Sequence, residues 1–144
     1  LPRAGYYRPG AGADLTVEHS LGKGVPHAAI VFYRALIQGD STAPIDALVE
    51  ALAAEGIAAL PVFVASLKDR DSEAFLADAF AANPAAIVLN PTSFPASPIA
   101  AAHGGTCRGL MAILGIAKPA AAPLVDIAQG VVYVFEGDKL TRYV

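Results

Sequence analysis

An unbroken apolar run, residues 28–33 (AAIVFY), is followed by a polar loop at residues 38–42 and then by an apolar pattern at helical spacing. The run is rich in β-branched and aromatic residues, which predicts a strand buried on both faces, as in a parallel sheet covered by helices. In such sheets ligands gather at the carboxyl ends of the strands, so the loop after Tyr33 is the first place to expect function.

The helix expected after this loop has signals at both ends. Ser41 or Thr42 is expected to cap its first turn, and Pro44 suits a position where the missing backbone donor has no helical partner. Gly56 supplies the left-handed residue that ends it. Its core-facing stripe consists of Ile45, Leu48, Val49 and Leu52.

The pattern then repeats. Residues 57–64 predict a second strand, in which Pro61 removes a backbone donor and favours an edge position or an effective start after the proline. A second helix, capped by Asp71 or Ser72, ends at Asn83-Pro84. Phe75, Leu76, Ala79 and Phe80 share one of its faces. Residues 86–89 predict a short third strand.

Three strands alternating with two helices predict an α/β fold. Right-handed crossovers place such strands in one open, mainly parallel sheet with three layers, of flavodoxin-like or Rossmann-like type. Residues 131–135 and 139–144, joined at 136–138, predict a C-terminal β-hairpin. Residues 109–116 fit either a short helix or a fourth strand.

The first 26 residues, LPRAGYYRPGAGADLTVEHSLGKGVP, are rich in Gly and Pro, which favours turns and an extended arm over regular structure. Tyr6 and Tyr7 are expected to pin this arm to the domain, whereas Arg3 and Arg8 are expected to be solvated. The predicted organisation is therefore an N-terminal arm at 1–26 and a single α/β domain at 27–144, with the structure from about residue 104 left open.

The composition fits one domain with a sizeable core, because 55% of the 144 residues are hydrophobic. A net charge of −3 and scattered basic residues argue against a nucleic-acid partner. No stretch supplies the roughly 20 apolar residues of a membrane span, so we expect a soluble domain with no membrane partner. The single cysteine, Cys107, suits a reducing compartment, and we expect a cytoplasmic location.

The loop of residues 39–42, hereafter the candidate loop, can hold an anion where hydroxyls and free N–H groups meet at a helix N-terminus. Helix capping alone is the competing interpretation. No GxGxxG or GxxxxGK[ST] motif is present, which disfavours a dinucleotide or P-loop site. The candidate ligand-binding residues are Tyr33, Arg34, Gln38, Asp40, Ser41 and Thr42.

The residue types that bind metals lack the spacing of a metal site. His19, His27 and His103 are far apart in the sequence, and Gly104-Gly105 opposes a helix that would bring His103 and Cys107 to one face. No paired catalytic carboxylates or GxSxG elbow stand out. We therefore expect no metal ligands, no cofactor bound by this domain and no identifiable catalytic residue.

Three segments together resemble a known family. LPRAGYYRPG, IVFYRALIQGDSTAPIDALVEALAAEGIAALPVFVASLKD and AAIVLNPTSF are similar, in this order, to the large subunit of aerobic cobaltochelatase (CobN type), and more distantly to the H subunit of magnesium chelatase. The resemblance extends from Leu1 to about His103. Beyond that point, GTCRGLMAILGIAKPAAAPLVDIAQGVVYVFEGDKLTRYV departs from the course expected of the family.

The resemblance implies that this chain is an internal fragment of a much longer subunit, contributing to ATP-dependent cobalt insertion into a corrin-ring a,c-diamide in cobalamin biosynthesis and inactive alone. It implies as partners the remaining domains of the large subunit, separate AAA+ subunits and the corrinoid substrate, with cobalt and ATP required by the whole complex. The alternatives are a stand-alone flavodoxin-type module that binds a small ligand and a purely structural interaction domain.

Overall fold

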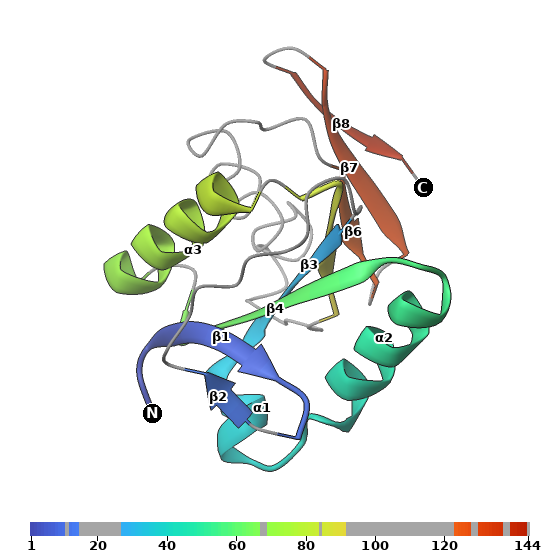
Figure 1. Cartoon of the computed structure of the whole chain (residues 1–144). Helices are drawn as coiled ribbons and strands as arrows, with labels where there is room; N and C mark the ends of the chain where they lie inside the picture. The colour runs from blue at the N-terminus through green and yellow to red at the C-terminus, as the bar shows by residue number, and fades with distance from the viewer. Residues whose placement is uncertain are drawn as a thin grey trace.

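The structure, a computed structural model, describes residues 1–10, 12–14, 27–66, 69–83, 85–91, 123–127, 130–136 and 139–143. Its strands form one sheet in the order β2-β1-β4-β3-β5-β6-β7-β8 (Figure 1). The strands are β1 (Ala4–Arg8), β2 (Gly12–Asp14), β3 (His27–Tyr33), β4 (Ala58–Val64), β5 (Ile87–Asn90), β6 (Leu124–Asp126), β7 (Val131–Glu136) and β8 (Lys139–Tyr143). The helices are α1 (Arg34–Gln38), α2 (Ala43–Ala54) and α3 (Arg70–Ala82).

The four central strands, β4, β3, β5 and β6, are parallel, which confirms the predicted mainly parallel α/β sheet. β3 lies at the centre and pairs with β4 along its whole length, from the His27↔Ala58 pair to the Tyr33↔Val64 pair. Its other neighbour is β5, with Ile30 opposite Leu89. The strand predicted at 28–33 is therefore the axis of the sheet.

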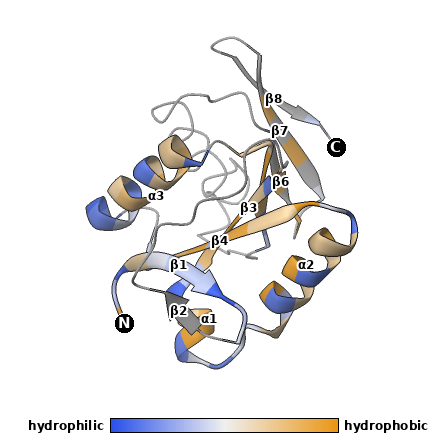
Figure 2. Cartoon of the chain, in the orientation of Figure 1, coloured by the Kyte–Doolittle hydropathy of each residue, from blue (hydrophilic) through white to orange (hydrophobic). Residues whose placement is uncertain are grey.

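Alternate residues of the strands enter two separate cores, one on each face of the sheet. Val31 and Val62 pack with Leu76 and Phe80 of α3 on the first face. On the second face the core contains α2 residues, Ile45 above all, together with strand residues. α2 and α3 accordingly lie on opposite sides of β3 and β4 (Figure 1), and Figure 2 shows that these two strands carry a concentration of hydrophobic residues.

The predicted stripe of α2 is confirmed. Ile45 is 1% exposed, and Leu48, Val49 and Leu52 pack against the same core. Gly56 has a φ of 76°, as the stop signal predicted, and the N–H groups of Gly56 and Ile57 donate to the carbonyls of Ala53 and Leu52. This pair of bonds is a Schellman motif, which satisfies carbonyls that the helix end would leave unpaired.

The capping residue of α3 was predicted wrongly. Asp69, rather than Asp71 or Ser72, is the N-cap, and its side chain accepts a hydrogen bond from the Ser72 N–H. The sequence around this start, KDRDS, offers several capping residue types, and only the backbone geometry selects among them. The face formed by Phe75, Leu76, Ala79 and Phe80 is confirmed, as is the end of the helix at Asn83.

The expectation of an irregular N-terminal arm is wrong for residues 4–8 and 12–14. β1 pairs antiparallel with β4 on one side and with β2 on the other, so the N-terminal segment extends the sheet. Tyr6 and Tyr7 are 8% and 4% exposed and enter opposite cores, which confirms that they pin this segment to the domain. Residues 15–26 lie outside the described residues.

The edge position suggested by Pro61 is also wrong, because β4 lies between β1 and β3. The ladder between β1 and β4 begins at the Tyr6↔Val62 pair, one residue beyond the proline. β1 therefore pairs only with the part of β4 that follows Pro61, the residue that lacks a backbone donor. For this reason β4 can be an internal strand and still contain a proline.

At the other edge, β6 continues the parallel set beside β5, and β7 and β8 add antiparallel pairs, with Val125 opposite Val132 and Val134 opposite Thr141. The connection at 137–138, the stretch 109–116 and the residues His19, His103 and Cys107 lie outside the described residues.

Candidate functional site

The strand order reverses between β3 and β5. From β3 the chain passes through α2 to β4 on one side, and from β4 it crosses through α3 to β5 on the other side. In open α/β sheets the crevice outside the carboxyl ends of the strands at such a reversal is the usual place for a ligand. Tyr33, the last residue of β3, and Asn90, the last residue of β5, mark this point.

The predicted residues surround this reversal without converging on one point. Tyr33 is half-buried and packs against the core on the α3 side, whereas Leu36 and Ile37 of α1 pack on the α2 side. Arg34, also half-buried, begins α1, and its Nη1 lies 3.5 Å from the carbonyl oxygen of Leu1. The short helix α1 between Tyr33 and the candidate loop was not predicted.

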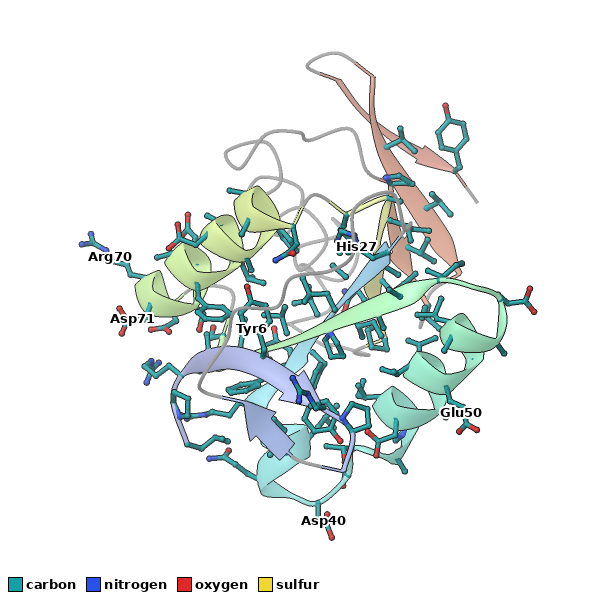
Figure 3. All side chains as sticks on the ribbon, in the orientation of Figure 1. Tyr6, His27, Asp40, Glu50, Arg70 and Asp71 are labelled. Carbon is teal, nitrogen blue, oxygen red and sulfur yellow. The ribbon has the colours of Figure 1, made fainter. Side chains whose placement is uncertain are left out.

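Of the other four predicted residues, Gln38 ends α1, Asp40 and Ser41 lie in the turn that follows it, and Thr42 comes directly before α2. Gln38, Asp40 and Ser41 are exposed, and Thr42 is half-buried. Thr42 occupies the N-cap position of α2, but its side chain makes no capping hydrogen bond, so the predicted capping interaction is absent. Figure 3 shows Asp40 directed away from the sheet.

Asp40 forms the turn that ends α1. Its φ of 53° is left-handed, a conformation that costs a side chain with a Cβ free energy and that glycine adopts readily. The N–H groups of Asp40 and Ser41 donate to the carbonyls of Ile37 and Leu36 at 3.1 and 2.8 Å. Asp40 therefore ends α1 with the same Schellman geometry that Gly56 gives to α2.

Asp40→Gly should raise the free energy of unfolding by about 0.5–1 kcal/mol, because glycine relieves the left-handed strain while keeping both main-chain bonds. Urea denaturation monitored by circular dichroism measures the change. As a control, Gln38→Gly places glycine two residues earlier, within α1, and should lower stability by up to about 1 kcal/mol. A loss of stability in Asp40→Gly would contradict this expectation and would show that the Asp40 carboxylate stabilises the turn.

A polar cluster at the carboxyl end of β4 joins the N-terminus to α3. Arg3 Nε donates to Asp69 Oδ2 at 3.0 Å, so Arg3, although 52% exposed, is ion-paired rather than only solvated. The Ser72 hydroxyl donates to the same oxygen at 2.8 Å and lies 3.3 Å from the Ala65 N–H, from which it accepts. Since Ser72 is fully buried, this cluster fixes how α3 meets β4.

The Asp69 carboxylate gives this cluster a dependence on pH. Hydrogen bonds from Arg3 and Ser72, followed by the charge of Arg3, hold the pKa of Asp69 below its ordinary value of 3.8. A carboxyl with a lowered folded-state pKa stabilises the fold above its unfolded-state pKa and loses that contribution as the pH falls through the folded-state pKa.

Asp69→Asn should therefore lower stability at neutral pH, and the difference from the unsubstituted chain should shrink once the pH falls below about 3.8. Thermal unfolding at several pH values between about 6 and 2 measures this. Asp71→Asn, which removes an exposed carboxylate from the same helical turn, is the matched control. A constant difference between Asp69→Asn and the unsubstituted chain over the whole range would contradict the role given to the charge.

A second polar contact ties β1 to α2. The Tyr7 hydroxyl donates to Asp46 Oδ1 at 2.5 Å, over 39 residues of sequence. Burial raises the pKa of Tyr7 above 10, the hydrogen bond with Asp46 adds to this rise, and a hydrogen bond with Thr42 opposes it. The phenol consequently stays protonated and able to donate at neutral pH.

Metal ligands do not gather in the described part of the chain, which holds no group of three or more His, Cys, Asp or Glu side chains placed to bind an ion. His27 is buried at the amino end of β3, and its Nε2 lies 3.1 Å from the Asn83 carbonyl oxygen at the end of α3. Among the described residues, no helix is long and apolar enough to cross a membrane.

The profile of the family described as CobN/Magnesium Chelatase matches residues 1–123. The chain belongs to the CobN/magnesium chelatase family. The match extends past His103, where the resemblance in sequence was expected to end, so residues 104–123 also follow the family.

Two curated relatives are named aerobic cobaltochelatase subunit CobN. The protein from Sinorhizobium sp is 43% identical over 107 residues, and the one from Pseudomonas aeruginosa is 37% identical over 100 residues. Each match covers 67% of this chain and 8% of the relative. A solved structure, the catalytic subunit of cobaltochelatase from Mycobacterium tuberculosis, is 28% identical, with a TM-score of 0.46, and the match covers 64% of this chain and 7% of that one.

Sequence reasoning missed the contacts or burial of three polar residues of this chain, Asn90, Tyr7 and Arg3. Asn90 is 1% exposed at the carboxyl end of β5, and its position directly after an apolar strand was the available signal. Tyr7 and Arg3 gave no such signal, since their partners lie 39 and 66 residues away in the sequence.

Proposed function

We propose that this chain is an α/β domain of a CobN-type cobaltochelatase large subunit. In this role it contributes to ATP-dependent insertion of cobalt into a corrin-ring a,c-diamide during cobalamin biosynthesis, and it has no turnover alone. The observation that carries the proposal is the family match over residues 1–123. Because the chain spans only 8% of the length of the curated relatives, most of the machinery would lie in other parts of the subunit.

The proposed partners are the remaining domains of the large subunit, AAA+ subunits that hydrolyse ATP, and the corrinoid itself, in the cytoplasm. This domain would bind no resident cofactor. Family membership favours this role over a stand-alone flavin-binding module. We also propose a flavodoxin-like arrangement of three layers, supported by the order β4-β3-β5-β6 and by helices on both faces, and a C-terminal hairpin supported by the pairing of β7 with β8.

Within the domain, the proposed contact with the corrinoid is the carboxyl end of β3, formed by Tyr33, Arg34 and the candidate loop. Arg34 is the strongest candidate, because a guanidinium donates several charge-assisted hydrogen bonds to carboxylate or amide oxygens at the rim of the ring. It starts α1 beside the point where the strand order reverses, which supports this placement.

Absorbance titration with a metal-free corrin a,c-diamide tests this contact in the large subunit that the proposal implies. Arg34→Ala should weaken binding by about 10-fold to 100-fold, the range expected when a hydrogen bond to a charged group is lost. Arg70→Ala removes the same charge from the exposed start of α3, beside β4, and should leave the affinity unchanged. Equal affinities for all three proteins would remove Arg34 from the site.

A further inference from the structure

Tyr7 differs from an ordinary core tyrosine because its two ends have different partners. The ring is buried in the core on the α2 face and meets Phe32 of β3 edge to face, with the ring centroids 5.5 Å apart. The hydroxyl extends to Asp46 in the first turn of α2. One side chain thus connects β1, the central strand β3 and the start of α2.

Asp46 lies in the first turn of α2, which directly follows the candidate loop in the sequence. Its N–H donates to the carbonyl of Thr42 at 3.0 Å, the first hydrogen bond of α2. At the other end of the loop, the N–H groups of Asp40 and Ser41 donate to carbonyls of α1. The Thr42 side chain does not cap α2, but it hydrogen-bonds Tyr7, as the carboxylate of Asp46 does, so both side chains link this turn to the sheet.

We propose that Tyr7 is a positioning residue for the candidate loop, acting through Asp46 and through its hydrogen bond with Thr42; this inference rests on the proposed function of that loop. The hydroxyl fixes the carboxylate of Asp46, the carboxylate fixes the first turn of α2, and the turn sets where Gly39–Thr42 lies relative to Arg34. The N-terminal strand, outside the predicted site, thereby takes part in it. A hydrogen bond between a phenol and a carboxylate suits this task because it is short and directional.

The test separates the hydroxyl from the ring. Tyr7→Phe keeps the contact with Phe32 and removes only the donor, Asp46→Asn removes the charge of the acceptor, and the double substitution completes a cycle. Tyr6→Phe is the matched control, because it removes a hydroxyl from the same strand on the face that carries α3. Each variant is made in the large subunit that the proposal implies and is studied by amide hydrogen exchange and by titration with metal-free corrin a,c-diamide.

Tyr7→Phe and Asp46→Asn should each speed exchange about tenfold at the Ser41 and Asp46 amides, with no further gain in the double variant, while the Val31 amide of β3 is unchanged. A general loss of stability would speed exchange at Val31 as well, so the local pattern distinguishes positioning from a merely structural role. Tyr6→Phe should leave the Ser41 and Asp46 amides unchanged.

Two results would overturn the inference: exchange at Ser41 and Asp46 that stays at its original rate in Tyr7→Phe, or exchange that rises equally at Val31. If either occurs while Arg34→Ala still weakens corrinoid binding, the proposed function of the loop survives and only the positioning role fails. Faster exchange at Ser41 and Asp46, with unchanged exchange at Val31, supports the positioning role of Tyr7. If in that case neither Tyr7→Phe nor Arg34→Ala changes the affinity for the corrinoid, the proposed function of the loop fails instead.

Discussion

Replacing Phe63 with alanine should lower the free energy of unfolding by about 3–5 kcal/mol, the usual cost of removing a large buried aromatic ring. Phe63 is fully buried in the core on the α2 face and stands opposite Phe32 in the pairing of β3 with β4. On the other side it covers Gly5 of β1 so closely that a Cβ placed there would lie 2.8 Å from the ring Cζ. Its removal leaves a cavity beneath three strands.

Urea denaturation of the purified chain measures this loss. Phe63→Leu is the matched variant and should cost clearly less, because leucine refills part of the cavity. A loss below about 1 kcal/mol for Phe63→Ala, with an unchanged dependence on urea, would contradict the burial of Phe63 against Gly5.

Leu76→Ala should cost about 2–5 kcal/mol on the opposite face of the sheet. Leu76 is fully buried in α3 and belongs to the core that contains Val31, Val62 and Tyr6. Ala74→Ser changes an exposed position of the same helix and should alter stability by no more than about 0.5 kcal/mol. Thermal or urea unfolding compares the two variants, and equal effects would contradict the orientation of α3.

Because the two cores are separated by the sheet, the losses in Phe63→Ala and Leu76→Ala should add to within about 0.5 kcal/mol. A coupling above about 1 kcal/mol in the double variant would show that the two side chains share a cavity. Where the double variant unfolds outright, Phe63→Leu combined with Leu76→Val tests the same additivity at a lower total cost.

Local patterns were enough to predict the central elements. The run of apolar residues at 28–33 fixed the position of β3, and the spacing of Ile45 with its neighbours fixed the buried face of α2. Gly56 and Asn83 marked the helix ends because backbone conformation at these positions depends on one residue and its neighbours.

The strand order and strand β1 were not predicted, because both depend on contacts between residues that are distant in the sequence. The strand order, including the reversal beside β3, is set by packing of whole elements and leaves no local signal. β1 has only five residues among glycines and prolines, and it is stabilised by pairing with β4 and by Tyr6 and Tyr7 in the two cores. Such tertiary contacts override the turn propensity of its flanks.

The position of the candidate loop in the fold was predicted, but its local structure was not. The loop after Tyr33 does follow the carboxyl end of the central strand, yet α1 intervenes and Asp40 serves the backbone of that helix. The interaction between Tyr7 and Asp46 joins residues 39 positions apart. No spacing in the sequence indicates it, since the tyrosine belongs to a segment without a helical or strand period of its own.

The most direct test of the proposed function is a cobalt-insertion assay with the proposed large subunit, the proposed AAA+ partners, ATP, cobalt(II) and a metal-free corrin a,c-diamide. The proposed function predicts that Arg34→Ala raises the KM for the corrinoid by about 10-fold or more, that Arg70→Ala behaves as the unsubstituted subunit, and that the 144-residue chain alone inserts no cobalt. An unchanged kcat and KM in Arg34→Ala, or insertion by the chain alone, would contradict it.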